Sequence, residues 1–188
     1  MKDTLISRRE FLKDIGMIGA GVLLSASPWL SAFSEVVETS GEKCRLAIIG
    51  PGSRGRFLMS FLVQNPKVEI VALCDIYQPS IEKALELAPK AKVYDDYREI
   101  LEDKTVDAVL VATPLNSHCQ IVLDAFDAGK HVFCEKSIGF TMEECFRIYN
   151  KHISTEKVFF TGQQRLFDPR YIKAMAVSYT HLTLPTKL

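Results

Sequence analysis

Short apolar runs alternate with amphipathic stretches through the middle of the chain. The second run, Val68–Cys74, is rich in β-branched residues and apolar enough for a strand buried on both faces of a sheet. Expected strands are Leu46–Ile49, Val68–Cys74, Lys92–Tyr94, Ala108–Ala112, His131–Cys134 and Val158–Thr161.

The stretches between these runs carry apolar residues at helical spacing. Expected helices are Arg54–Gln64, Pro79–Leu87, Tyr97–Glu102, Ser117–Ala128 and Met142–His152. In the first helix, the expected apolar face consists of Phe57, Leu58, Phe61 and Leu62. Repeated βα units of this length predict an α/β fold with a doubly wound parallel sheet, covered by helices on both faces.

A glycine-rich turn joins the first strand to the first helix. Gly50, Gly52 and Gly55 form a G-x-G-x-x-G pattern, and Asp75 ends the second strand twenty positions after Gly55. These glycines permit a tight turn, close approach to a pyrophosphate and close helix–strand packing, while the helix N-terminus offers N–H groups to phosphates. The pattern predicts a dinucleotide site in a Rossmann-type fold; the alternative is a glycine turn that binds nothing.

Asp75 also indicates which dinucleotide is bound. A carboxylate at this point accepts hydrogen bonds from the ribose hydroxyls and repels a 2′-phosphate. Ile76 and Tyr77 follow it, so that no arginine stands ready for that phosphate. The prediction is NAD, with NADP as the less favoured cofactor.

Further candidates follow the fourth and fifth strands, because ligands bind at the carboxyl ends of strands in such sheets. Thr113 and Pro114 leave the sheet edge, and Asn116 or Ser117 is expected to cap the next helix. For His118, a structural residue of the first helical turn and a cofactor contact remain alternatives.

Glu135 and Lys136 follow the fifth strand, where a hydride-transfer enzyme needs a cation. Lys136 is suited to orient a substrate hydroxyl and to stabilise negative charge on its oxygen. The alternative is a surface ion pair between the two residues.

The ordered set of motifs resembles the Gfo/Idh/MocA oxidoreductases over roughly Lys43 to Ala176. The resemblance implies an N-terminal Rossmann domain, a C-terminal α/β domain, bound NAD or NADP, and a sugar, a cyclitol or a derivative as substrate. The motifs are Gly50–Gly55, Asp75, Thr113-Pro114 with His118, Glu135-Lys136, and Gly162–Arg165.

The resemblance also implies roles for individual residues. Lys136 is the implied catalytic residue, and Arg165, in the strand expected to leave the Rossmann domain, is assigned to the substrate side. Implied cofactor contacts are Gly50, Gly52, Ser53, Arg54, Gly55, Asp75, Thr113, Pro114, His118, Glu135 and Lys136.

The chain departs from the family pattern in two places. Ser137 stands where the family usually has a proline, and a trans Lys136–Ser137 bond is therefore expected. The homologous sequence stops near Ala176, before the domain that carries the family's usual catalytic histidine. The 188-residue chain itself is accordingly expected to be inactive.

The N-terminus is typical of a twin-arginine export signal. Arg8 and Arg9 lie within Ser7–Lys13, and Ile15–Ser34 contains no charged residue. The expectation is export to the periplasm by the twin-arginine translocase. The uncharged stretch, about 20 residues long, also has the length of a membrane span, so anchoring by an uncleaved signal is an alternative.

The expected organisation has four parts. A change of composition at Ser178–Leu188 suggests a non-native tail, with a genuine polar tail as the alternative. The parts are a signal peptide (1–34), an NAD-binding Rossmann domain (43–165), the start of a truncated substrate domain (166–176) and the tail (177–188).

Composition narrows the function. The formal net charge is zero, so no basic field points to nucleic acid. The five cysteines form no C-x-x-C pair and are expected to be mostly small core residues rather than zinc ligands.

The favoured function is an exported NAD-dependent oxidoreductase acting on a sugar or cyclitol derivative, represented by its cofactor domain. An NAD-retaining glycosidase of the same fold and a non-catalytic nucleotide-binding domain are alternatives. Homo-oligomerisation of the full-length protein is left open.

Overall fold

The structure is a computed structural model that describes residues 43–181. The predicted signal at 1–34 and the last seven residues of the predicted tail lie outside this range. The described part divides between Gly162 and Gln163 into two compact units, and each is described by itself. In residues 43–181, no helix is long and apolar enough to cross a membrane.

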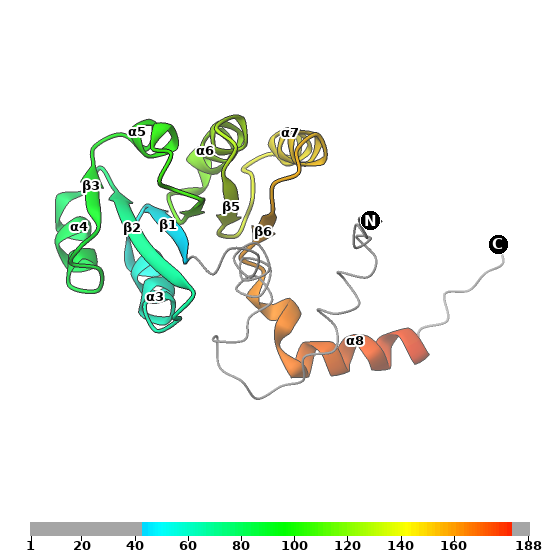
Figure 1. The fold of residues 1–188 in the computed structure, drawn as a ribbon. Helices are drawn as coiled ribbons and strands as arrows, with labels where there is room; N and C mark the ends of the chain where they lie inside the picture. Colours follow the sequence, from blue (N-terminus) through cyan, green and yellow to red (C-terminus); the bar gives the residue numbers. More distant parts are fainter. Residues whose placement is uncertain (1–42, 182–188) are drawn as a thin grey trace, which may run out of the picture. The chain divides into compact units, whose positions relative to one another are not determined.

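The first unit is built on one sheet of six parallel strands (Figure 1). Their order is β3-β2-β1-β4-β5-β6, so the chain runs outward from β1 to β3, returns beside β1 and runs outward again. This order confirms the predicted doubly wound, Rossmann-type sheet. The strands are β1 (Cys44–Ile49), β2 (Val68–Cys74), β3 (Lys92–Tyr94), β4 (Ala108–Val111), β5 (His131–Cys134) and β6 (Phe159–Thr161).

Helices cover both faces of this sheet. In Figure 1, α3 and α4 lie on one face, and α5, α6 and α7 lie on the other. The predicted helix boundaries agree with the observed ones to within two residues. The helices are α3 (Ser53–Leu62), α4 (Gln78–Leu85), α5 (Tyr97–Glu102), α6 (Leu115–Asp127) and α7 (Met142–Ile153).

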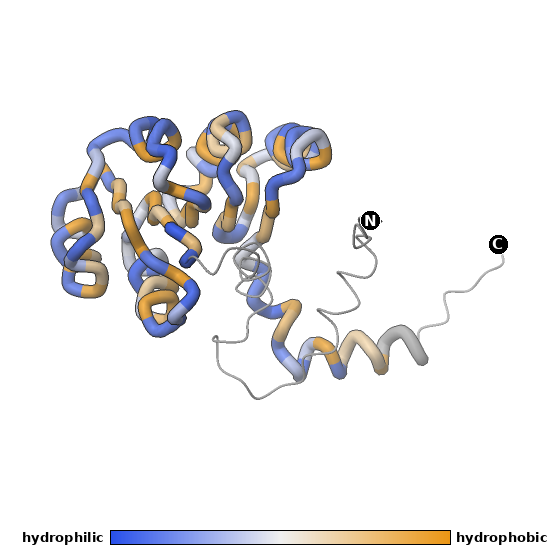
Figure 2. The backbone as a smooth tube through the Cα atoms, viewed as in Figure 1, coloured by the Kyte–Doolittle hydropathy of each residue, from blue (hydrophilic) through white to orange (hydrophobic). Residues whose placement is uncertain are grey.

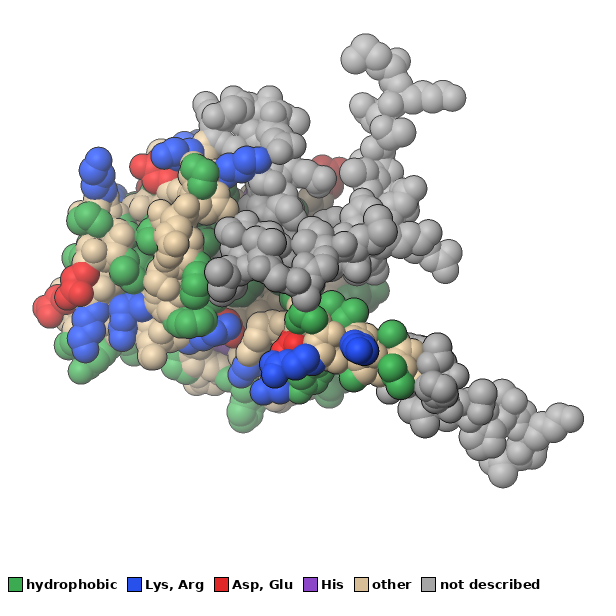
Figure 3. Space-filling view, turned by 90° about the horizontal axis from the view of Figure 1, so that it is seen from below, with side chains coloured by type: hydrophobic (Ala, Val, Ile, Leu, Met, Phe, Trp, Pro, Cys, Tyr) green, Lys and Arg blue, Asp and Glu red, His purple; other side chains and the backbone are tan. Residues whose placement is uncertain are grey.

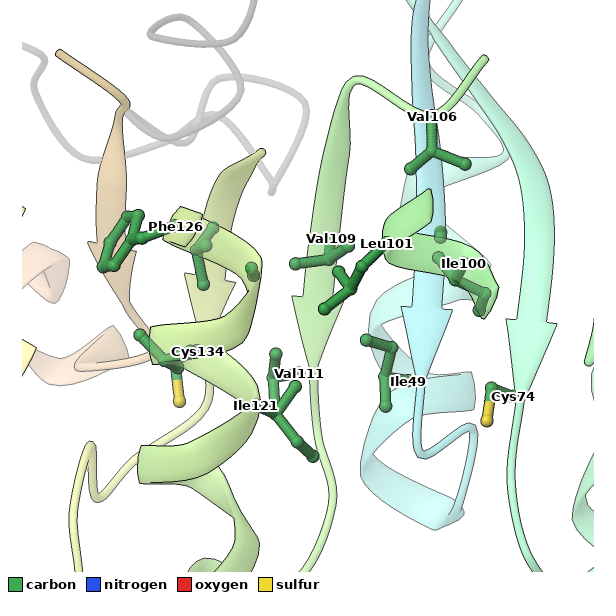
Figure 4. Close-up of a cluster of buried hydrophobic side chains, with 14 of the residues drawn as sticks. Ile49, Cys74, Ile100, Leu101, Val106, Val109, Val111, Ile121, Phe126 and Cys134 are labelled. Carbon is green, nitrogen blue, oxygen red and sulfur yellow. The ribbon is translucent and has the colours of Figure 1, made fainter. Parts of the chain in front are cut away.

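The core consists of two clusters, one on each face of the sheet. Leu46 and Ile48 of β1 belong to the cluster beneath α3 and α4, whereas Ile49 belongs to the one beneath α5, α6 and α7. Figure 4 shows part of the second cluster, where Val111 lies close to Ile121 of α6. Because both faces are buried, β4 is apolar along its whole length and β1 is apolar from Leu46 to Ile49. Figure 2 shows apolar (orange) segments in the strands as well as on the helices.

The predicted apolar face of α3 was partly wrong. The helix buries Gly55, Leu58, Met59 and Leu62, whereas Phe57 is 50% exposed. The buried set follows the spacing i, i+3, i+4, i+7. The first buried position of α3 is Gly55, which has no apolar side chain. The buried face of the helix was therefore hard to recognise from the apolar residues alone.

The second unit contains a short 3-10 helix, η2 (Gln164–Phe167), and the helix α8 (Pro169–His181). The segment expected to begin the substrate domain (166–176) therefore lies in η2 and in the first part of α8. The prediction that Arg165 lies in a strand was wrong: it lies in η2, where its guanidinium donates a hydrogen bond to the Tyr171 hydroxyl. The chain leaves the sheet earlier, at Gly162, whose N–H donates to the carbonyl of Cys134.

The surface of the α/β unit is mixed in character. Figure 3 shows hydrophobic side chains among both basic and acidic ones on the side of α3 and α4. This distribution accords with a formal net charge of zero.

Candidate functional site

The strand register places the predicted site residues along one edge of the sheet. Ile49 pairs with both Cys74 and Val111, Val111 pairs with Cys134, and Cys134 pairs with Thr161. The carboxyl ends of five strands are therefore aligned at this edge. The residues that follow these ends are Gly50, Asp75, Ala112, Glu135 and Gly162.

Gly50 and Gly55 are required by the fold itself. Gly50 has a φ of 84°, and a Cβ there would lie 2.7 Å from the backbone nitrogen of Thr113. A Cβ on Gly55 would lie 2.5 Å from the carbonyl oxygen of Gly50. Neither position accepts a side chain without displacement of backbone.

Gly52 is different. Apart from Gly52 itself and its two neighbours in the chain, no heavy atom of the described part of the chain lies within 4 Å of the position that its Cβ would take. The space beside Gly52 is therefore open, as the approach of a pyrophosphate to the backbone requires. The turn thus fits the phosphates of a dinucleotide.

The N-terminus of α3 adds to this fit. Gly52 is its N-cap, no side chain caps the helix, and its first turn contains no acidic residue. The N–H groups at a helix N-terminus suit an anion. Arg56, which was not among the predicted site residues, donates from Nη1 to the carbonyl of Pro51 at 2.8 Å and so stabilises the turn.

Asp75 lies directly after β2, at the same sheet edge as the glycine turn. Its Oδ1 accepts a hydrogen bond from the backbone N–H of Tyr77 at 2.9 Å, which shapes the turn into α4. Ile76, between them, is fully exposed. A carboxylate is therefore available where the ribose ligand was predicted.

The loop after β4 differs in detail from the prediction. The helix α6 begins at Leu115 with Pro114 as its N-cap, so a cap at Asn116 or Ser117 was wrong. Ser117 lies in the first turn, and its Oγ is 2.8 Å from both Thr113 Oγ1 and the carbonyl oxygen of Pro114. Pro114, with a φ of −58°, directs the chain into the helix earlier than expected.

His118 joins two loops of the site. The ring is 2% exposed, with Nδ1 2.7 Å from the carbonyl oxygen of Ser137 and Nε2 2.9 Å from that of Thr113. A neutral imidazole donates to one of these carbonyls, and a protonated one donates to both. The ring thus holds the loop after β5 against the loop after β4, and its contact with a cofactor stays a prediction.

Glu135 is buried, with 5% of its surface exposed, and its partner is Arg54. Arg54 Nε donates to Glu135 Oε1 at 2.6 Å, and the backbone N–H of Lys136 donates to Oε2 at 3.1 Å. Glu135 therefore does not form the surface ion pair with Lys136 that was the alternative. Its ion pair is with Arg54 and joins α3 to the loop after β5. Gly162 lies against the same carboxylate, since a Cβ there would be 2.8 Å from Oε2.

The prediction of a trans bond before Ser137 was wrong. The Lys136–Ser137 peptide bond is cis. The prediction rested on the general preference of non-proline peptide bonds for the trans form. The Lys136 side chain itself is exposed.

The cysteines nearest the site are inert core residues. Burial, followed by nearby carboxylates, raises the pKa of the Cys74 thiol to about 11. Burial and then the charge of Glu135 raise the pKa of the Cys134 thiol to about 12. Both stay protonated at neutral pH, and four of the five cysteines are buried, which confirms the prediction that most of them are core residues. Residues 43–181, as far as the structure describes them, contain no group of three or more potential metal ligands.

A family model for an oxidoreductase family with an NAD-binding Rossmann fold, GFO_IDH_MocA, matches residues 44–163. The chain belongs to this family. The match spans the whole described α/β unit, including the glycine turn and Lys136.

Relatives with curated names include glycosidases. A glycosyl hydrolase family 109 protein of Stenotrophomonas maltophilia is 34% identical over 162 residues, which cover 80% of this chain and 34% of that protein. An alpha-N-acetylgalactosaminidase of Shewanella oneidensis is 31% identical over 174 residues, covering 81% and 38% of the two chains.

Solved structures of similar fold include dehydrogenases. The myo-inositol dehydrogenase of Lactobacillus casei, in complex with NAD(H) and myo-inositol, is 32% identical with a TM-score of 0.66, covering 72% of this chain and 42% of that one. The myo-inositol 2-dehydrogenase of Lactobacillus plantarum is 27% identical with a TM-score of 0.68, covering 74% and 42%. This family member therefore spans less than half the length of these relatives.

Proposed function

We propose that this chain is the cofactor-binding part of an NAD-dependent enzyme that transfers hydride to or from a sugar or cyclitol derivative. The observation that carries the proposal is the alignment of an open glycine turn, a carboxylate and a lysine along one sheet edge. Gly52, Asp75 and Lys136 follow β1, β2 and β5, respectively, in this arrangement. The inositol dehydrogenases of similar fold support the class of substrate.

Each of these residues has a defined task in the proposal. The turn at Gly52 and the N-terminus of α3 bind the pyrophosphate, and Asp75 accepts hydrogen bonds from the ribose hydroxyls. When bound, NAD supplies the acceptor or donor of hydride. Lys136 orients the substrate hydroxyl and stabilises the negative charge that develops on its oxygen.

Cofactor binding is tested by calorimetric titration of the 188-residue chain with NAD and with NADP. We expect tighter binding of NAD, because the Asp75 carboxylate repels a 2′-phosphate. Tighter binding of NADP would overturn the preference, and no binding of either would overturn the proposed function.

A glycosidase that retains NAD is the second candidate, and the names of the relatives in glycosyl hydrolase family 109 favour it. In such an enzyme the sugar is oxidised transiently, the aglycone is eliminated, water adds to the resulting double bond and the sugar is reduced again, which departs from hydrolysis by two carboxylates. Hydride transfer at the same site serves both candidates.

A steady-state assay separates the two, on a chain extended to the length of these relatives. An oxidoreductase accumulates reduced cofactor in proportion to product. A glycosidase releases the aglycone of an N-acetylgalactosaminide without consuming free NAD. A protein that binds NAD and does neither would be a nucleotide-binding protein without catalytic function.

Export by the twin-arginine translocase is also proposed. It is supported by Arg8 and Arg9 ahead of the uncharged stretch Ile15–Ser34. Replacement of both arginines by lysine should leave the precursor in the cytoplasm. Unchanged accumulation in the periplasm would refute this, and recovery in the membrane fraction would indicate an uncleaved anchor.

A further inference from the structure

Arg54 and Glu135 are 81 positions apart in sequence, yet they form the ion pair at the centre of the site. Their side chains are 38% and 6% exposed, respectively, so the carboxylate is buried and the arginine side chain is partly exposed to solvent. A buried carboxylate is costly without a partner. The pair connects the first turn of α3, next to the glycine turn, with the residue before Lys136.

The carboxylate of Glu135 is held on several sides. Arg54 Nε binds Oε1 at 2.6 Å, and Oε2 accepts the backbone N–H of Lys136 at 3.1 Å. Gly162 closes the remaining side so tightly that a Cβ there would come within 2.8 Å of Oε2. The carbonyl oxygen of Ser137 in turn lies 2.7 Å from His118 Nδ1, so the backbone has a polar contact on both sides of the Lys136–Ser137 peptide bond.

We propose that Arg54 and Glu135 act together as positioning residues for Lys136. Arg54 fixes the Glu135 carboxylate, and Glu135 fixes the backbone N–H of Lys136, so that the exposed ammonium is presented at the cofactor edge of the sheet. The inference rests on the proposed function of Lys136. It also revises the role implied for Arg54, whose Nε is committed to Glu135.

Arg54 is either a ligand of the cofactor phosphates or a partner that positions Glu135. Calorimetric titration of the 188-residue chain with NAD distinguishes these two roles, because they predict opposite effects of Glu135→Gln on the affinity for NAD. If Arg54 were a phosphate ligand restrained by Glu135, removal of the carboxylate charge would free it and tighten NAD binding. If the two are a positioning pair, Arg54→Gln and Glu135→Gln each loosen the site and weaken NAD binding, by about tenfold. The double variant should then be no weaker than either single one.

Two outcomes of this titration would overturn the proposal. One is tighter NAD binding by Glu135→Gln. The other is a double variant whose loss of affinity is the product of the two single losses, which would show that the residues act independently. Arg54→Lys, which keeps the charge, should recover part of the affinity.

The Arg45–Asp107 pair provides a matched control. It joins β1 to the residue before β4 at the opposite, amino edge of the sheet, with a shortest contact of 2.8 Å and side chains that are 39% and 34% exposed. Arg45→Gln should lower the melting temperature of the chain and leave its affinity for NAD unchanged.

A second measurement does not depend on NAD, and so separates this inference from the proposed function. Amide hydrogen exchange followed by NMR should show the Lys136 N–H exchanging about tenfold faster in Arg54→Gln, because the bond to Oε2 loses its support. Arg45→Gln should leave this rate unchanged. An unchanged rate in Arg54→Gln, or in Arg54→Met if the glutamine variant does not fold, would overturn the inference even if wild type binds NAD.

Discussion

Alanine substitutions in the glycine turn should separate folding from cofactor binding. Gly52 is the N-cap of α3 with a φ of −62°, which alanine adopts readily, and no described residue beyond its two chain neighbours would touch the added methyl group. Alanine is a poorer N-cap than glycine by about 0.5–1 kcal/mol. It also lowers the entropy of the unfolded chain, which stabilises the fold by about 0.4–1 kcal/mol. The free energy of unfolding of Gly52→Ala should therefore stay within about 0.5 kcal/mol of wild type.

Gly50→Ala should behave in the opposite way. A φ of 84° costs an alanine about 1–2 kcal/mol. The new Cβ would also lie 2.7 Å from Thr113 N and 2.9 Å from Ala112 C, so backbone has to move. Overpacking of this kind typically costs about 1–3 kcal/mol. The sum is a loss of about 2–5 kcal/mol, which for a chain of this size lowers the melting temperature by roughly 4–20 °C.

Although Gly52→Ala should leave stability nearly unchanged, it should impair cofactor binding. Its methyl group would stand where the backbone must approach the pyrophosphate, so Gly52→Ala should weaken NAD binding by at least about tenfold, or about 1.4 kcal/mol. Denaturation curves and calorimetric titrations on the same preparations measure both quantities.

Gly129→Ala is the control for backbone strain alone. Gly129 has a φ of 69° just beyond the end of α6, and the nearest atom to its Cβ would be Lys157 Cε at 3.7 Å. It should lose about 1–2 kcal/mol of stability and bind NAD like wild type. A stable Gly52→Ala that binds NAD as tightly as wild type, or a Gly50→Ala as stable as wild type, would refute the reasoning.

Three further predictions concern single groups and the chain as a whole. Asp75→Ala should weaken NAD binding in the same calorimetric assay by about 1–3 kcal/mol, because a charged hydrogen bond is lost. Hydrogen bonds from the Thr105 side chain and then from Tyr94 lower the pKa of Asp103 from 3.8 to about 2, so its stabilising effect is complete above pH 3.8 and is lost as the pH falls through about 2. Thr105→Ala should reduce this part of the acid destabilisation in denaturation curves between pH 4 and pH 2. The 188-residue chain should bind NAD weakly and give no sugar-dependent change in the absorbance of reduced nicotinamide. The reason for the missing turnover is that Lys136 alone does not provide both substrate positioning and proton transfer. Robust turnover would contradict this prediction.

Much of the site could be predicted because its chemistry is local in sequence. The tight turn at Gly50 and the open backbone at Gly52 follow from the glycine spacing, and Asp75 follows from its place at a strand end. His118 was harder, since its position in the first turn of a helix did not reveal that its ring would bind Ser137 and Thr113.

By itself the sequence determined the order and type of the elements. Continuous apolar runs are required of strands buried on both faces, and helical periodicity is required of the segments that cover them. These constraints act between near neighbours, so they can be recognised without knowledge of the fold, and they led correctly to a doubly wound parallel sheet.

Tertiary structure alone decided which distant groups meet. Arg54 pairs with Glu135 because the register β1–β4–β5 brings the start of α3 beside the end of β5, and no local pattern encodes that approach. The exposure of Phe57 likewise depends on how α3 is rotated against the sheet, which Gly55 determines by allowing close contact with the carbonyl of Gly50. Such contacts depend on strand pairing and helix orientation together, and those are properties of the whole fold rather than of any segment.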